Sequence, residues 1–476
     1  MDRARNILRN GAWLTRERIR LVAVALLIAS SVGLLYLVVT AHGAIDRQGR
    51  PLGTDFSNVY AAGTYVNEGQ PEAPFDPALQ FARERAIFGE ATQFYGWHYP
   101  PYFLFIASAL ARMPYGLALA VWQAVSLGLY LLTIRAILGS SFRGPRSGNP
   151  ESITTEIERQ APKTSFRTLW LWIPALARDA RSAGMTAASD PLWLLLALAF
   201  PAVLINIGHG QNGFLTAALL GGALVTLDRR PLVAGILIGL LAYKPQFGLM
   251  IPIALLAGGR WRSFAAAAAT VAVFTLATTF AFGPQVWHAF LASTEFSRTV
   301  VLEQGNTGWH KIQSVFSWAR MWGAPVPLAY AIQGAVTVAL GAVLAWLWRS
   351  AAPYPLKAAA LCLAAILATP YSLDYDMMVL APAIAFFAAD GFTRGFGPWE
   401  KTALAALWLV PLVARSVAQV SLIPLGVPAM LAMFVLIVRR AELDLTWPMA
   451  FRKEPSTMAS GPGGPSRGHD IAAFKS

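Results

Sequence analysis

Polar side chains that could act on a hydroxyl group are gathered in residues 44–101, directly after the first long apolar run. Asp55 lies near the start of this segment, and His98-Tyr99 lies near its end. An aspartate can remove the proton from a hydroxyl that comes within hydrogen-bonding distance. Asp55 could instead cap a helix running to about Asn67, and the two uses are compatible. Because connections between helices usually take a few residues, so long a polar segment indicates a function of its own.

His98 and Tyr99 precede Pro100 and Pro101, which prevent a helix from extending backward through them. His98 could position a phosphate or a hydroxyl group, with Tyr99 beside the substrate. Alternatively, the two rings could anchor the segment at a membrane interface.

Lys244 lies between two apolar runs and is followed by Pro245 and Gln246. A lysine at membrane depth is costly and by default marks a functional site, for which an anionic phosphate is the natural partner. A lysine that extends its amine to the membrane surface from a helix end is the alternative. The two short runs around Lys244-Pro245 indicate a broken hairpin with a polar tip, which also carries Gln246.

Gln211 and Asn212 follow Gly210 between two apolar runs. Their amides could face a cavity, although the same residue types make a plain turn. Asp374, Tyr375 and Asp376 occupy a similar junction, where the carboxylates could bind acceptor hydroxyls, a metal, or only lysine and arginine partners.

A sparse set of cations lies among tryptophans in residues 283–326 and consists of Arg298, His310, Lys311 and Arg320. Aromatic rings with cations suit sugar stacking and phosphate binding, and they also suit anchoring at the membrane interface. The sequence contains no zinc-binding His/Cys pattern, phosphate-binding glycine loop or GxSxG nucleophile motif. We therefore expect no metal and no cofactor.

These residues are carried by a very apolar chain. Its 476 residues are 56% apolar and 13% charged, against roughly 25% charged in soluble domains. Several uncharged runs approach the roughly 20 residues that cross a bilayer, which predicts an all-α polytopic membrane protein. The net charge of +13 sits in short segments between apolar runs, as in cytoplasmic loops, and does not indicate nucleic-acid binding. The single cysteine, Cys362, excludes a disulfide framework.

The apolar runs predict about twelve spans. Taken alternately, they place every basic cluster on one side, which puts both termini in the cytoplasm. The predicted spans lie near 21–41, 116–138, 191–207, 212–227, 231–243, 246–257, 263–282, 327–348, 355–369, 375–389, 401–417 and 421–438.

This organisation predicts a basic cytoplasmic tail at 1–20, a transmembrane domain at 21–438 and a partly disordered cytoplasmic tail at 439–476. Outer loops cover 44–100 and 283–326, and a cytoplasmic insert covers 139–190. Within the first loop, Asp76-Pro77 predicts a helix start and Gly89 its end. Leu169–Ala177 in the insert is apolar but short, which favours an interfacial helix.

The order of these motifs resembles glycosyltransferase family 87, polytopic GT-C enzymes that include mycobacterial polyprenyl-phosphate-mannose-dependent α-mannosyltransferases. The resemblance covers about residues 20–440, without the insert. It rests on Asp55-Phe56, Tyr60-Ala61-Ala62-Gly63, Tyr99-Pro100-Pro101, Trp122, Gly210-Gln211-Asn212, Ala234-Gly235 with Gly239, and Lys244-Pro245.

The resemblance implies sugar transfer from a lipid-linked donor on the non-cytoplasmic face, without a nucleotide sugar. It assigns Asp55 as the catalytic aspartate and His310 as an assisting histidine, with His288 and His98 as competing matches. Lys244 would then lie near the donor phosphate, with Arg298 or Arg320. The remaining candidates for substrate binding are Tyr99, Gln211, Asn212, Gln246, Asp374 and Tyr375.

We therefore expect a glycosyltransferase of the bacterial inner membrane. It would move a hexose, with mannose the first choice, from a polyprenyl-phosphate donor to a glycan or glycolipid on the outer face. A transporter or flippase of a lipid-linked substrate is the alternative, since such folds often carry internal repeats and charged sites at the midplane. An inactive scaffold is a third hypothesis, and it predicts no pocket that joins Asp55 to Lys244.

Overall fold

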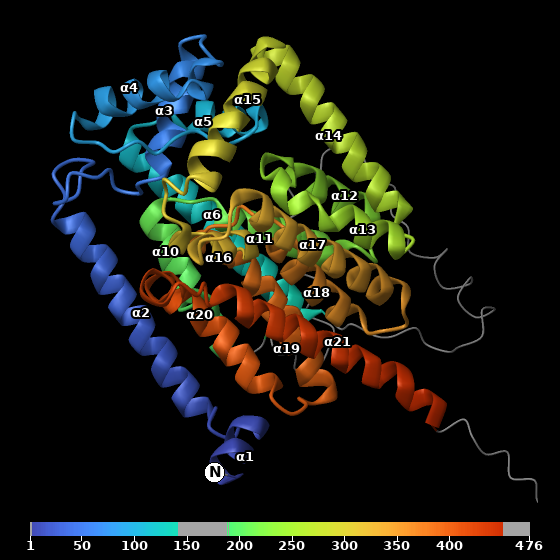
Figure 1. Ribbon diagram of the computed structural model, residues 1–476. Helices are drawn as coiled ribbons and strands as arrows, with labels where there is room; N and C mark the ends of the chain where they lie inside the picture. The colour runs from blue at the N-terminus through green and yellow to red at the C-terminus, as the bar shows by residue number, and fades with distance from the viewer. Residues whose placement is uncertain (1, 141–187, 189, 451–476) are drawn as a thin grey trace, which may run out of the picture.

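The computed structural model describes residues 2–140, 188 and 190–450. Its regular structure is helical, and the described residues contain only three isolated β-bridges. The prediction of an all-α fold is therefore confirmed, and Figure 1 shows the helices packed into one body. The predicted insert helix at Leu169–Ala177 and the end of the C-terminal tail lie outside the described residues.

The helices fall into long apolar rods, shorter apolar helices and small polar helices. In chain order they are α1 Asp2–Asn10, α2 Arg16–Val39, α3 Phe56–Asn67, α4 Pro77–Phe88, α5 Leu104–Leu110, α6 Tyr115–Gly139, α9 Leu192–Leu198, α10 Pro201–His209, α11 Gly213–Thr226, α12 Pro231–Leu240, α13 Met250–Ala257, α14 Trp261–Phe282, α15 Gln285–Phe296, α16 Val315–Met321, α17 Val326–Arg349, α18 Tyr354–Leu367, α19 Leu380–Arg394, α20 Glu400–Ser421 and α21 Gly426–Ala450.

Membrane-crossing length is reached by six apolar helical segments among the described residues, or by seven if the bent pair α9–α10 counts as one span. The six are α2, α6, α14, α17, α20 and Asp374–Arg394, which joins a 3₁₀ turn to α19. The chain is therefore a multi-pass membrane protein.

The count of about twelve spans is not confirmed. Four of the predicted spans form shorter apolar helices, at Gly213–Thr226, Pro231–Tyr243, Pro245–Ala257 and Tyr354–Leu367. A helix of 14 residues is only about 21 Å long at 1.5 Å per residue, whereas the hydrocarbon core is roughly 30 Å thick. Most of the last predicted span, 421–438, falls in α21, which begins at Gly426 and continues to Ala450.

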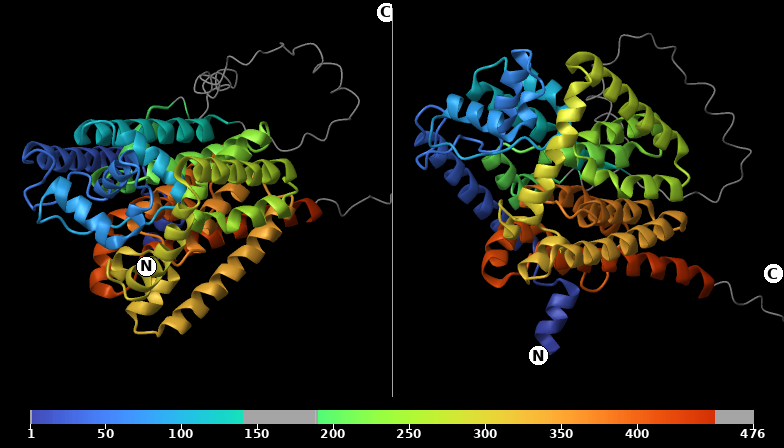
Figure 2. Two further views of the ribbon diagram at one scale, coloured as in Figure 1. Left: turned by 90° about the horizontal axis from the view of Figure 1, so that it is seen from above. Right: turned by 45° about the horizontal axis from the view of Figure 1, so that its top comes forward.

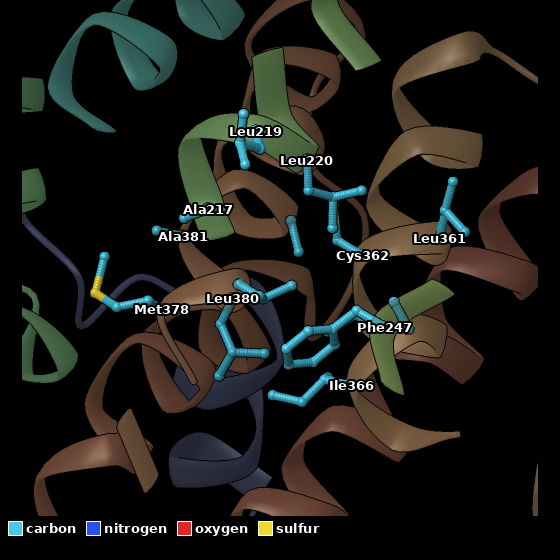
Figure 3. Close-up of a cluster of buried hydrophobic side chains, with 14 of the residues drawn as sticks. Ala217, Leu219, Leu220, Phe247, Leu361, Cys362, Ile366, Met378, Leu380 and Ala381 are labelled. Carbon is cyan, nitrogen blue, oxygen red and sulfur yellow. The ribbon is translucent and has the colours of Figure 1, made fainter. Parts of the chain in front are cut away.

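The core is built around α18, in which every residue except Tyr354 and Lys357 is buried. A helix that is apolar on all sides must be surrounded by other helices. Figure 3 shows Leu361, Cys362 and Ile366 of α18 among side chains from neighbouring segments, including Phe247 and Leu380. This buried helix packs against α13, α17, α19 and α21.

The first polar loop folds as the sequence predicts. Asp76 caps α4 by accepting hydrogen bonds from the backbone of Ala78 and Leu79, and Gly89 ends the helix. Figures 1 and 2 place α3, α4 and α5 together at one end of the molecule, close to α15. The N-terminal helix α1 lies at the opposite end of α2.

Helix α3 is held against α5 by an unusually close approach at Gly63. A Cβ atom at this position would lie 2.1 Å from the carbonyl oxygen of Ala107 and 2.7 Å from Cβ of Ala111. Because α3 begins directly after Asp55, this contact fixes the direction in which the helix enters the site.

Gly63→Ala should therefore destabilise the protein by about 1–3 kcal/mol, the usual cost of adding a methyl group to a filled interior. The matched control is Gly33→Ala in α2, where an added Cβ would meet nothing within 4 Å. Thermal unfolding of the two purified variants in detergent checks this. Equal unfolding midpoints for the two would contradict the close packing of α3 on α5.

Candidate active site

A cavity of about 510 Å³ opens where the polar junctions of the chain converge. Asp55 and Lys244 both line it, together with residues from the first loop, the end of α10, the segment 296–311 and the junction before α19. The scaffold hypothesis predicted no pocket joining these two side chains, and that expectation is wrong.

Asp55 occupies the N-cap position of α3, but its side chain makes no capping hydrogen bond to the described backbone. Its Oδ2 instead accepts a hydrogen bond of 2.7 Å from Nε2 of Gln211. The Oε1 atom of Gln211 in turn accepts hydrogen bonds from the hydroxyl of Tyr99 and the backbone of Asn212. The capping alternative for Asp55 is therefore not realised, and Gln211 orients the carboxylate.

His209 is the histidine beside Asp55. Its Nδ1 lies 3.9 Å from Oδ1 of Asp55 and 2.7 Å from the hydroxyl oxygen of Thr54. The Gly210 turn produces this arrangement, because its left-handed backbone (φ +64°) ends α10 and directs Gln211 back toward the same carboxylate. The Gly210 turn was expected from the sequence, whereas no role was expected for His209.

Lys244 is buried, and its amine forms an ion pair of 2.5 Å with Oδ1 of Asp376. The other carboxylate oxygen of Asp376 accepts the backbone N–H of Leu373. The alternative of a lysine extending to the membrane surface is therefore wrong, because the side chain is only 4% exposed. A phosphate at Lys244 would share the amine with a carboxylate that is already present.

Two further cations on the cavity wall are less firmly paired. The guanidinium of Arg415, which is 41% exposed, lies 3.6 Å from the buried carboxylate of Asp374. Burial, followed by the positive charge of Arg415, lowers the pKa of Lys311. Arg415 and Lys311 are thus neighbouring cations, and the carboxylate contact recorded for them among the described residues is the 3.6 Å contact of Arg415, so the pair is suited to bind an additional anion.

Arg415 was missed because it lies inside the apolar run 401–417, which was assigned as a span. A charged residue within a span is a functional candidate by default, so a signal was present. Lys311 was noticed, but only as a member of a basic set.

The predicted phosphate ligands Arg298 and Arg320 lie elsewhere, outside the described lining of the cavity. Arg298 pairs with Glu295 and Glu303, and Arg320 donates to two backbone carbonyls while stacking on Trp309. Both side chains hold the segment 295–324 together. Because these contacts are made within the protein, the geometry gives no support to the prediction that Arg298 and Arg320 bind the donor phosphate.

Among the other predicted residues, Gln246, Asp374 and Tyr375 line the cavity, as do His98 and Tyr99. The described lining includes neither Asn212 nor His310. Asn212 is buried, at 2% exposure. In the segment that contains His310, the neighbouring residue Lys311 lines the cavity instead.

His98 is held in the wall by a hydrogen bond of 2.8 Å between Nδ1 and the hydroxyl of Ser297. Burial lowers the pKa of His98 to about 4, outweighing the opposite effect of the Asp55 charge. His98 is therefore uncharged near neutral pH and acts as a hydrogen-bonding group, not as a cation for a phosphate.

The low pKa of His98 predicts a loss of stability in acid. In the unfolded chain a histidine takes up its proton near pH 6.5, so the folded state is progressively disfavoured as the pH falls from about 6.5 toward 4. His98→Asn keeps a hydrogen-bonding atom near the position of Nδ1 but cannot be protonated. Its unfolding midpoint should fall less than that of wild type between pH 7.5 and 5, whereas the exposed His288→Asn should follow wild type. Parallel curves for all three proteins would refute the assignment.

Comparison with known proteins agrees with this geometry. Searches of curated proteins and of solved structures give no match. The sequence pattern of glycosyltransferase family 87 matches residues 97–370, more than half of the chain. This region includes Gln211, Lys244 and Lys311 of the cavity wall, whereas Asp55 lies before it. The chain belongs to glycosyltransferase family 87.

Proposed function

We propose that this membrane glycosyltransferase transfers a hexose, with mannose the first candidate, from a polyprenyl-phosphate donor. The acceptor would be a glycan or glycolipid on the outer face of the bacterial inner membrane, with both termini of the enzyme in the cytoplasm. The observation that carries the proposal is the common cavity of Asp55 and a group of cations. Sugar transfer from a phosphate requires both a base and cationic help for the leaving group.

Asp55 is suited to the role of base. Its Oδ2 is fixed by Gln211, while no hydrogen bond to Oδ1 is made by the described residues. In the proposed reaction the acceptor oxygen forms a bond to the anomeric carbon, and its proton passes to Oδ1. The bond from that carbon to the phosphate oxygen breaks, and the electron pair leaves with the phosphate. Base and leaving group on opposite faces of the sugar would invert the anomeric configuration.

The departing phosphate would bind at Arg415 and Lys311. An added phosphate charge would relieve the repulsion between these two cations and improve on the 3.6 Å contact between Arg415 and Asp374. Lys244 would add positive potential from its buried pair with Asp376. His209 replaces His310 and His98 in this proposal as the histidine that supports Asp55.

Asp55→Asn should lower kcat by about 10²–10⁴-fold, the usual contribution of general-base catalysis, because the amide keeps the shape and loses the basic oxygen. Asp76→Asn provides the matched control, since asparagine caps a helix as well as aspartate does. Membranes that carry each variant are given polyprenyl-phosphate [³H]mannose and an alkyl mannoside, and labelled product is counted. Undiminished transfer by folded Asp55→Asn protein would remove Asp55 from the mechanism.

Lys311→Met and Arg415→Gln should each raise the donor KM by about 10–100-fold, since a charged hydrogen bond contributes about 1.5–3 kcal/mol. Arg298→Gln should leave it within about twofold, because Arg298 pairs with glutamates away from the cavity. Initial rates at varied donor concentration test this for all three variants. A larger rise in the donor KM for Arg298→Gln than for Arg415→Gln and Lys311→Met would contradict this assignment and favour the phosphate site first predicted from the sequence.

A further inference from the structure

Glu84 belongs to a closed ring of hydrogen bonds behind the cavity wall. Its Oε2 accepts the backbone N–H of Tyr95 at 3.0 Å, and its Oε1 accepts from Nε2 of Gln80 at 3.2 Å. Gln80 also donates to the backbone carbonyl of Asn58. The side chain of Asn58 completes the ring by donating to the carbonyl of Tyr95 at 3.1 Å.

The ring joins three elements that the chain keeps apart. Asn58 lies on α3, one turn after Asp55, whereas Gln80 and Glu84 lie on α4. Tyr95 lies in the segment 93–99, most of which lines the cavity. Both polar atoms of the Tyr95 peptide are thus bound, one by each helix, which fixes the wall relative to the base.

The buried surroundings of Glu84 favour its protonated form. Glu84, Gln80 and Asn58 are all at most 3% exposed, and Oδ1 of Asn58 and Oε1 of Gln80 have no hydrogen-bond partner among the described residues. A protonated carboxyl adds a donor where acceptors are in excess. In agreement, burial raises the pKa of Glu84 to about 7.

The wall that the ring holds has the character of a saccharide site. Phe94 and Tyr95 contribute aromatic side chains to this wall, and Gln93 contributes an exposed amide that can meet hydroxyl groups. On this side the described lining carries the cation Arg50, which is bound by both its Nε and its NH2 to Asp46. The loosely paired cations Arg415 and Lys311 come from other segments, so phosphate and saccharide are expected at different parts of the cavity.

We infer that Glu84 is a positioning residue for the acceptor: through Asn58 and Tyr95 it sets segment 93–99 as the wall against which an acceptor saccharide lies within reach of Asp55. This inference rests on the proposed transfer reaction and deepens it by assigning the acceptor side. Glu84 does not itself contact the reacting atoms.

The test compares Glu84→Ala with Glu84→Gln, since glutamine resembles the protonated acid and can keep both donor and acceptor functions. Glu90→Gln, on an exposed residue just after the same helix, is the control. The probes are polyprenyl-phosphate [³H]mannose and a set of alkyl glycosides, with each substrate varied against a saturating concentration of the other. Hydrogen–deuterium exchange of peptides covering 93–99 and 56–67 gives a second readout that needs no turnover.

Glu84→Ala should raise the acceptor KM by about tenfold or more, because the wall loses roughly one good hydrogen bond. The donor KM should stay within about twofold of wild type. Exchange should accelerate in 93–99 and much less in 56–67. Glu84→Gln should restore both properties to within about threefold of wild type, and Glu90→Gln should change neither.

Three outcomes overturn the inference: an unchanged acceptor KM in Glu84→Ala, equal rises in both KM values, or unchanged exchange in 93–99. Uniformly faster exchange across the protein would also overturn it, by showing a general role in stability. Failure of wild type to use any alkyl glycoside would refute the saccharide wall. Failure to release labelled mannose from the lipid donor to any acceptor would instead refute the proposed function, and the exchange experiment would still decide the role of Glu84.

Discussion

The site depends on the ion pair between Lys244 and Asp376, in which each buried charge is neutralised by the other inside an apolar helical body. Lys244 sits at the break between α12 and α13, and Asp376 sits at the start of the turn before α19. Removing one partner of such a pair typically costs about 3–5 kcal/mol, because the other charge remains buried. The pair therefore makes the relative position of the two junctions a condition for the folded state. Both side chains line the cavity, so the same condition fixes this part of its wall.

A second constraint fixes the part of the wall that carries Asp55. The helix that follows Asp55 is wedged against α5 at Gly63, and its first turn is tied to α4 and to Tyr95 through side-chain amides. The carboxylate itself is oriented by Gln211 from the Gly210 turn. Asp55 is thus held by contacts from α5, from α4 with Tyr95, and from Gln211. The second oxygen of its carboxylate, Oδ1, is left available to a substrate. Such support of a reacting group by surrounding residues is what precise positioning requires.

Much of this could be read from residue types and order. Long apolar runs predicted the helices, Asp76 and Gly89 predicted the bounds of α4, and the motif order indicated that Asp55 and Lys244 lie near one another. The partners could not be read, because Gln211 and Asp376 lie 156 and 132 residues from the groups they bind. Their pairing is decided by packing between distant helices. The count of about twelve spans is not confirmed for a related reason: several apolar runs are buried by neighbouring helices and need not be long enough to cross a bilayer.

The sealed position of Cys362 in the middle of α18 has a practical consequence. The thiol is fully buried and surrounded by aliphatic side chains, so thiol reagents have no access to it in the folded protein. A cysteine introduced at any exposed position of the described chain would then be the sole reactive thiol. Spectroscopic labels could be attached there without first altering the native sequence, which leaves the packing of the central helix untouched.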